Sequence, residues 1–319
     1  MRRFLLACAI VLCSIASAWP QAWPTRPIRA IVPLTAGAAT DIMARTVLEQ
    51  VSAQIGQPIV VENRPGAGNT IGMAAVAKAD PDGYTILVNS STHTISPATR
   101  SNLPFDPTGD LAAIIPLGNM PVVMVVNPSK GYKKLSDFVA AAKAKPGSIN
   151  YASAGAGNSS HLNGERFRLA AGFQAVHVPQ RGAPEALTEV MAGRLDFYFA
   201  PLLNSLPFLK DGQLQALAVS GSQRASALPD VPTTVEAGYP NSEYNFWVGV
   251  FAPAKIARDI RVKLHEEIAK ALAHPATREK LKNLGADPMQ MTPEQFDAHV
   301  RKEIEINREL VMAAGINVN

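Results

Sequence analysis

Apolar and polar positions follow two alternating patterns along most of the chain. A near-continuous apolar run at 28–34 is typical of a strand buried on both faces of a parallel sheet. Apolar residues then recur at every fourth position from Met43 to Ile55. This spacing predicts a helix with Thr40 or Asp41 at its N-cap and Gly56 after its last turn.

The same alternation of strands and helices continues to the end of the chain. Further strands are predicted at 57–62, 84–90, 173–179, 194–200 and 214–220, and further helices near 69–78, 135–143, 185–191 and 260–272. The segment "TPEQF" at 292–296 is a capping box that opens another helix. Strands that alternate with helices predict an α/β fold, with parallel sheets and helices on both faces.

The length of 319 residues is too great for one ordinary core and suits two α/β lobes. Proline-rich segments near 97–107 and 229–240 are places where the chain could pass between such lobes. We expect residues 23–122 with 246–319 to form one lobe, and residues 123–245 to form the other.

The first 18 residues have the pattern of a secretory signal peptide. Arg2 and Arg3 precede an apolar run, and Ala18 or Ala22 could end the cleaved segment. Both cysteines, Cys8 and Cys13, lie in this segment, so the mature chain has no disulfide and no cysteine metal site. Its 28 basic and 26 acidic residues leave a formal charge of +2, which does not favour nucleic acid. We therefore expect an exported, soluble protein with a small partner.

Small and polar residues gather where predicted strands give way to helices. Such loops meet at the carboxyl ends of parallel strands, where helix N-termini can hold a carboxylate or a phosphate. The alternative is that the glycines only serve tight turns. Two such loops, one in each predicted lobe, favour the anion site. The transitions are at 33–41, 64–72, 89–93 and 153–161.

The loop at 153–161 does not match a dinucleotide cradle or a catalytic elbow. Gly155 and Gly157 fit the first two glycines of G-x-G-x-x-G, but Ser160 takes the third position. The loop is not G-x-S-x-G either, and His265 starts "HEEIA", which is not the zinc pattern H-E-x-x-H. We predict no cofactor, no metal and no catalytic residue.

Asp196 is an acidic residue within a predicted strand. Alternation places it on one face with Tyr198 and Ala200, opposite Phe197 and Phe199. A buried aspartate needs partners, so it either caps a neighbouring helix or faces a ligand.

Taken together, several segments resemble the Bug receptors, the extracytoplasmic solute-binding proteins of tripartite tricarboxylate transporters. The similarity covers essentially the whole mature chain, in the order and spacing of the family. The matching segments are "WPTRPIRAIVPLTAGAATDIMAR", "VVENRPGAGNTIG", "ADPDGYTIL", "SAGAGNSSHLNGERF", "HVPQRGAPEALTEVMAGRLDFYF", "LQALAVSGSQRASALPDVPTTVEAGYP" and "WVGVFAPAKI".

The resemblance implies a type II periplasmic-binding-protein fold, in which two doubly wound lobes close on a ligand in a central cleft. It also implies that backbone N–H groups and hydroxyls of two loops hold a ligand carboxylate. Carried over to this sequence, the ligand-binding residues are Leu34, Thr35, Ala36, Gly37, Ala39, Thr40, Asp41, Ser90, Thr92, Gly155, Ala156, Gly157, Asn158, Ser159, His161, Gln180, Arg181, Gly182, Asp196 and Ala200.

Two departures from the family pattern bear on ligand identity. The first loop reads "TAGAATD", where family members usually have paired glycines, so the methyl groups of Ala38 and Ala39 narrow access to the backbone. Gln180 stands where the family usually has a tyrosine, which replaces an aromatic wall by an amide.

The resemblance implies a periplasmic receptor that captures a small carboxylate, either a di- or tricarboxylate or an aromatic acid. Its partners would be that acid and the membrane permease subunits of a tripartite tricarboxylate transporter, and we expect a monomer. One alternative is an exported serine esterase that uses Ser159 or Ser160 with a distant histidine. Another is a receptor that feeds a membrane sensor.

Overall fold

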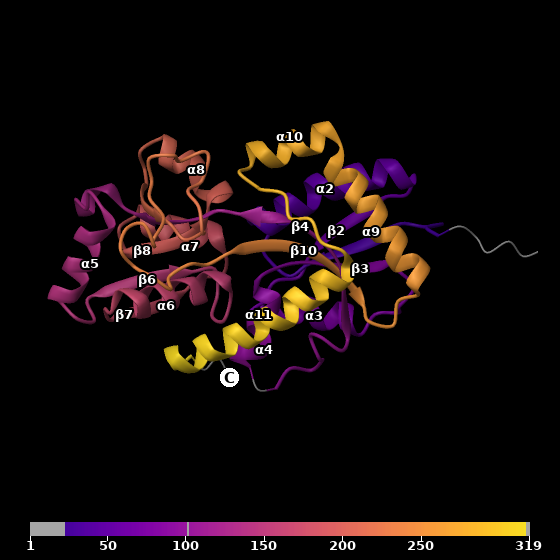
Figure 1. Ribbon diagram of the computed structural model, residues 1–319, viewed down its shortest axis with the longest axis horizontal. Coiled ribbons are helices and arrows are strands. Elements are labelled where there is room, and N and C mark those ends of the chain that lie inside the picture. The colour runs from indigo at the N-terminus through magenta and orange to yellow at the C-terminus, as the bar shows by residue number, and fades with distance from the viewer. Residues whose placement is uncertain (1–22, 101, 317–319) are drawn as a thin grey trace, which may run out of the picture.

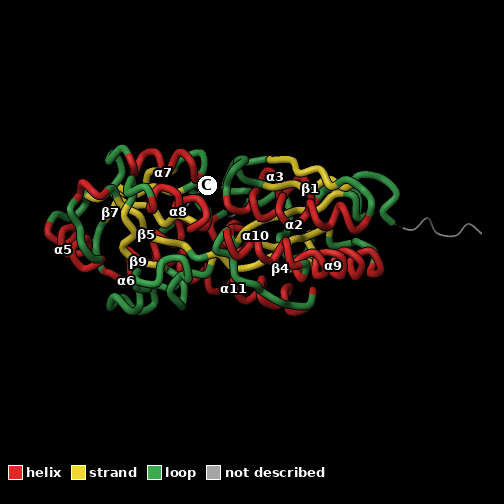
Figure 2. Tube along the Cα trace, turned by 90° about the horizontal axis from the view of Figure 1, so that it is seen from above, coloured by secondary structure: helices red, strands yellow, loops and turns green. Residues whose placement is uncertain are grey.

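The chain forms two five-stranded sheets that lie one after the other along the long axis of the molecule (Figures 1 and 2). The computed structural model describes residues 23–100 and 102–316, so the predicted signal peptide lies outside the described residues. The strand order is β2-β1-β3-β10-β4 in the first sheet and β7-β6-β8-β5-β9 in the second. Helices pack around both sheets, so the predicted α/β fold with two lobes is confirmed.

The first lobe is built from an N-terminal part and a C-terminal part of the chain. Its strands are β1 (Ile28–Val32), β2 (Ile59–Asn63), β3 (Thr85–Ser90), β4 (Leu111–Met120) and β10 (Phe246–Pro253). Its helices are α2 (Ala39–Ile55), α3 (Thr70–Ala77), α4 (Thr92–Thr99), α9 (Arg258–Ala273), α10 (Pro275–Asn283) and α11 (Pro293–Ala314).

The second lobe comes from the middle of the chain. Its strands are β5 (Val122–Val126), β6 (Ile149–Ser153), β7 (Ala175–Pro179), β8 (Phe197–Pro201) and β9 (Gln215–Val219). Its helices are α5 (Leu135–Ala144), α6 (Ser159–Ala171), α7 (Ala183–Met191) and α8 (Leu202–Lys210), with a short 3-10 turn η1 (Pro128–Lys130). The exact residue limits of the lobes as domains stay a prediction.

Each sheet is mixed, which corrects the expectation of parallel sheets. Strand β10 is antiparallel to β3 and β4, and β5 is antiparallel to β8 and β9. Both strands receive the chain from the other lobe, so they start at the cleft and run opposite to their parallel neighbours, which end there. The first passage is at Pro121, between β4 and β5, and not at 97–107 as the sequence suggested.

The predicted helix patterns match the buried faces of the helices. Met43, Val47 and Val51 of α2 are at most 1% exposed and face the largest apolar cluster. At the start of α11 the capping box is present, because the Thr292 hydroxyl accepts from the Gln295 N–H and the Gln295 side chain accepts from the Thr292 N–H. Helix α11 packs on α4 and also contacts α6, so it touches both lobes.

Candidate functional site

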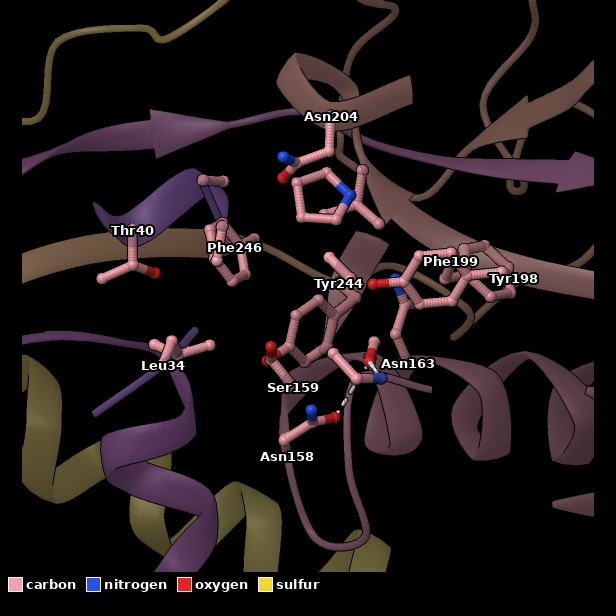
Figure 3. Close-up of a pocket in the computed structure, with 17 residues that line it drawn as sticks. Leu34, Thr40, Asn158, Ser159, Asn163, Tyr198, Phe199, Asn204, Tyr244 and Phe246 are labelled. Atoms are coloured by element: carbon pink, nitrogen blue, oxygen red, sulfur yellow. Dashed lines mark hydrogen bonds between the residues drawn. The ribbon is translucent and has the colours of Figure 1, made fainter. Parts of the chain in front are cut away.

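A cleft lies between the two lobes, where the carboxyl ends of their parallel strands meet (Figure 3). The space between its walls, with the adjoining open solvent included, is about 420 Å³. The first lobe lines it with Leu34, Ala38, Ala39, Thr40 and Phe246; the crossovers and the second lobe add Val122, Ala154, Asn158, Ser159, Ser160, Asn163, Ala183, Tyr198, Phe199, Pro201, Asn204 and Tyr244.

The N-terminus of α2 reaches the cleft without a side-chain cap. The N-cap is Ala38, so the expectation of Thr40 or Asp41 at this position was wrong. Gly37, with φ of 79°, turns the chain into the helix earlier than the polar residues suggested. The first N–H groups of a helix lack partners within it and carry partial positive charge. This helix end can therefore receive an anion.

Thr40 adds a free hydroxyl at the same helix end. The residue is 1% exposed and lines the cleft, yet its Oγ1 has no hydrogen-bond partner within residues 23–100 and 102–316. A buried hydroxyl without a partner is costly in a folded protein. A ligand atom or a water molecule in the cleft would satisfy it.

Asp41 shapes this loop without lining the cleft. Its carboxylate accepts from the Gly37 N–H at 3.0 Å, from Arg45 Nε at 3.0 Å and from Asn63 Nδ2 at 2.9 Å. Burial by itself would raise its pKa, but the bonds from Arg45, Gly37 and Asn63 hold the pKa of Asp41 below its usual value. The charged carboxylate thereby fixes the turn before α2.

The N-terminus of α6, in contrast, is capped by the side chain of Asn158. The Asn158 side chain accepts from the His161 N–H at 3.0 Å and from the Ser160 hydroxyl at 2.9 Å. The Ser159 N–H donates to Thr92 Oγ1 of the first lobe at 3.1 Å. Asn158 and Ser159 line the cleft as predicted, but these N–H groups are occupied.

The glycine loop before α6 differs from its predicted role. Its N–H groups bond within the second lobe, Gly155 to Ser153 Oγ at 3.2 Å and Gly157 to His161 Nδ1 at 3.1 Å. Neither glycine lines the cleft, nor does Ala156. The loop instead lies against the first lobe at Gly68, where a Cβ would come within 3.0 Å of the Ala156 carbonyl oxygen. The loop is a contact between the lobes, and the N–H groups of Gly155 and Gly157 are already bonded within the second lobe.

His161 lies beneath this loop and is stacked on His177, with 3.7 Å between the ring centroids. The His177 Nε2 is 2.6 Å from the Ser153 hydroxyl. Burial lowers the pKa of His161 to about 4 and that of His177 to about 3, and in His177 the neighbouring His161 adds to the shift. Both rings are therefore neutral at pH 7 and support the loop.

Asp196 was expected to cap a helix or to face the ligand, and it does neither. It precedes β8, at the end of the strand away from the cleft, because strand β8 starts at Phe197 and its last residue, Pro201, lines the cleft. Its carboxylate accepts from Lys130 Nζ at 2.7 Å and from the Asn150 N–H at 2.8 Å. The residue therefore stabilises the far end of the second sheet.

The other predicted residues surround the cleft without lining it. Ser90 and Thr92 are buried and bonded to each other, and Ala200 belongs to a core cluster. The Gln180 amide bonds to the carbonyl of Val178, and Arg181 is exposed. Thr35 and Gly182 face each other across the lobes, because a Cβ on Gly182 would lie 2.5 Å from Thr35 Oγ1. Ala36 and Gly37 are exposed.

None of the seventeen lining residues carries a charge, and four of them are aromatic. The sequence interpretation missed most of the second-lobe wall. Asn163 could have been found, because it lies four residues after Ser159 and so on the same helix face. Asn204 follows the end of β8, a fifth strand-to-helix transition. Tyr244 and Phe246 lie in the returning crossover, and no local pattern indicates them.

Two negative findings apply to residues 23–100 and 102–316. No group of three or more histidine, cysteine or acidic side chains there is arranged to hold a metal ion. No helix in these ranges combines the length and the apolar character that a membrane span requires.

Comparison with known proteins places this architecture among binding proteins. Residues 43–316 match the model of the tripartite tricarboxylate transporter family receptor. The chain is 33% identical to a UPF0065 protein of Bordetella pertussis over 98% of this chain and 96% of the relative. It is 34% identical to the protein BugT of the same organism, over 96% and 95%.

Three solved structures share the fold closely. The periplasmic binding protein BugD superposes with a TM-score of 0.87 at 30% identity, covering 92% of this chain and 99% of BugD. Rpa4515 of R. palustris with adipate gives 0.88 at 30% identity, covering 92% and 99%. MatC of Rhodopseudomonas palustris with bound malate gives 0.85 at 31% identity, covering 91% and 100%. The likeness to these proteins confirms the predicted type II fold.

Proposed function

Because the chain belongs to the tripartite tricarboxylate transporter receptor family, we propose that it captures a small organic acid between its lobes and delivers it to a membrane permease of that transporter class. Membership confirms the resemblance to the Bug receptors and makes the chain a solute-binding receptor. The esterase alternative is therefore wrong, and no histidine or acidic residue lines the cleft beside Ser159 and Ser160.

The N-terminus of α2 carries this proposal. It offers N–H groups without a side-chain cap, and the Thr40 hydroxyl beside them is buried and unpartnered. A carboxylate accepts from both kinds of donor, and charge-assisted hydrogen bonds are about twice as strong as neutral ones. The relatives with adipate and malate also hold carboxylates.

Closure of the lobes is the second part of the proposal. Hydrogen bonds join the lobes across the cleft, among them those from the Ser159 N–H to Thr92 Oγ1 and from Asn204 Nδ2 to the Gly37 carbonyl. An acid bound between the lobes would favour this closed arrangement, because it contacts both of them only there. We place this event in the periplasm, in agreement with the predicted signal peptide and with the periplasmic BugD.

Calorimetric titration of the exported protein with mono-, di- and tricarboxylates and aromatic acids tests the binding step. We expect at least one acid to bind, and Thr40→Val to weaken its binding about tenfold by removing a hydrogen bond to a charged group. Thr46→Val is the matched control, since Thr46 lies on α2 and bonds to the Ile42 carbonyl away from the cleft. The absence of binding by every acid would contradict the proposal.

Delivery is tested by the uptake of the labelled acid into cells with and without the gene. We expect uptake at low concentration to fall when the gene is deleted and to return when it is restored. Normal uptake in the deletion strain would contradict the transport step while leaving the binding step intact.

A further inference from the structure

Two asparagines in the cleft each have a carbonyl oxygen without a partner. Asn163 of α6 is fully buried and Asn204 of α8 is partly buried, and both line the cleft. The Oδ1 atoms of both are buried and make no hydrogen bond among the described residues. Buried polar groups normally have partners, so two such atoms in one cleft point to something that binds there.

The orientation of the Asn163 amide follows from its neighbours. Its Nδ2 is 2.9 Å from Ser220 Oγ, and that hydroxyl lies 3.4 Å from the carbonyl oxygens of both Val122 and Tyr244. In this arrangement the Ser220 hydroxyl accepts from the Asn163 amide nitrogen and faces the two carbonyl oxygens, which only accept. The amide nitrogen faces Ser220, and Oδ1 is left without a partner among the described residues.

The orientation of the Asn204 amide is fixed by a carbonyl group of the first lobe. Its side chain lies 2.8 Å from the carbonyl oxygen of Gly37, which can only accept, so the atom facing Gly37 is the amide nitrogen. Oδ1 is again the atom left without a partner. Figure 3 shows Asn204 and Asn163 on the second-lobe side of the cleft, with Leu34 and Thr40 on the other side.

Building on the proposed function, we infer that the bound acid has a single carboxylate and, away from it, a neutral hydroxyl or N–H group that donates to Asn163 or Asn204. The carboxylate belongs at the N-terminus of α2, where the donors are. A second carboxylate would bring its oxygens against two carbonyl oxygens, and none of the lining side chains is a cation to offset that repulsion. Leu34, Phe199 and Phe246 provide apolar contact for the carbon frame.

Calorimetry with matched probes tests this inference. The sets are 4-hydroxybutyrate with butyrate and succinate, 6-hydroxyhexanoate with hexanoate and adipate, and 4-hydroxybenzoate with benzoate and terephthalate. In the set that fits the cleft, we expect the hydroxy acid to bind about three- to tenfold tighter than the plain acid, as for one added neutral hydrogen bond. The diacid of that set should bind more weakly than both.

Two variants assign the effect to the asparagines. Asn204→Leu and Asn163→Leu remove the acceptor at similar volume, and the preference for the hydroxy acid over the plain acid should fall towards unity in at least one of them. The ratio is the readout, because each variant also loses a bond to Gly37 or Ser220 that affects both acids equally. Asn283→Leu, an exposed position at the end of α10, is the control and should keep the full ratio.

The possible failures are distinguishable. A diacid that binds as tightly as the hydroxy acid, or a ratio unchanged in both leucine variants, overturns this inference and leaves the proposed receptor function in place. Binding by none of the probes or of the wider panel of acids overturns both.

Discussion

The backbone N–H of Ser159, in the first turn of α6, donates a hydrogen bond of 3.1 Å to Thr92 Oγ1, in the first turn of α4. These two residues belong to different lobes, and both are at most 7% exposed. The bond exists only while the lobes are together, so it contributes to closure and not to the stability of either lobe alone.

Replacing Thr92 should therefore weaken ligand binding, in addition to removing the bond that the Ser90 hydroxyl donates to Thr92 within the first lobe. Thr92→Val leaves the Ser159 N–H buried without an acceptor in the closed state, which costs about 1 kcal/mol, and we expect affinity for the bound acid to fall about fivefold. Calorimetry gives the affinity. Thr92→Ser keeps the hydroxyl and should bind normally; equal affinity of the valine and serine variants would contradict the role of this bond.

A side chain at Gly182 should keep the lobes apart. A Cβ there would lie 2.5 Å from Thr35 Oγ1 and 3.2 Å from Thr35 Cγ2, so rotating Thr35 does not relieve the clash. We expect Gly182→Ala to weaken binding about tenfold or more, as overpacking typically does. Thr35→Ala in the same chain removes both atoms and should restore affinity. Small-angle scattering with ligand checks whether the single variant stays open; a compact, tightly binding variant would refute the prediction.

The contribution of Glu303 to the stability of the first lobe should fall as the pH rises towards and past neutrality. Glu303 of α11 is largely buried, and burial raises its pKa to about 7 although Thr94 and Trp247 donate to its carboxylate and Arg166 of the second lobe lowers the pKa. Its folded pKa lies above its unfolded value, so the stability it provides is complete below about 4.5 and is lost as the pH passes about 7.

Glu303→Gln should remove this dependence and retain both hydrogen bonds through the amide oxygen. We expect the variant to gain about 2 kcal/mol relative to wild type between pH 5 and pH 8. Urea unfolding at several pH values measures it. Glu309→Gln, on the exposed side of α11, is the control, and parallel profiles for wild type and Glu303→Gln would show the prediction to be wrong.

Acid should destabilise the protein through its buried histidines. Burial lowers the pKa of His93 to about 4, that of His161 to about 4 and that of His177 to about 3. Their folded pKa values lie below the ordinary value of 6.5, so the stability they confer is present above that pH and is lost as the pH falls towards 4.

His177→Gln should reduce this loss, because it removes one of the stacked rings and still reaches Ser153. We expect the drop in unfolding free energy from pH 7 to pH 5 to shrink by about 2 kcal/mol. Denaturant unfolding at the two pH values measures the drop, with exposed His274→Gln as the control. A drop as large as that of wild type would show that His177 is not protonated on unfolding.

Local patterns in the sequence were sufficient for most elements and for the family. The stripe from Met43 to Ile55 and the capping box at Thr292 depend on neighbours within one or two turns, so they predict helices before any lobe exists. The segments that resemble the family extend over the whole mature chain, so they also predicted the receptor fold. Three of the predicted residues, Leu34, Ala39 and Thr40, line the cleft, since the loop after β1 leads directly into α2.

The rest of the site was decided by tertiary structure. Asp196 looked like a ligand residue until the direction of β8 placed it at the far end of the strand, beside Lys130. The sequence suggested that the Gly157 N–H was free for a ligand, but in the structure it donates to the ring of His161, four residues further along the chain.

The unpartnered oxygens of Asn163 and Asn204 also depend on tertiary structure. The sequence alone does not show whether the amide nitrogen or the amide oxygen of an asparagine lacks a hydrogen-bond partner. That depends on Ser220 and Gly37, which lie 57 and 167 residues away along the chain and become neighbours only when strands and lobes assemble. The sequence by itself determined the receptor class and the helix α2, whose N-terminus reaches the cleft. Packing between the lobes decided which polar atoms remain free to bind the ligand.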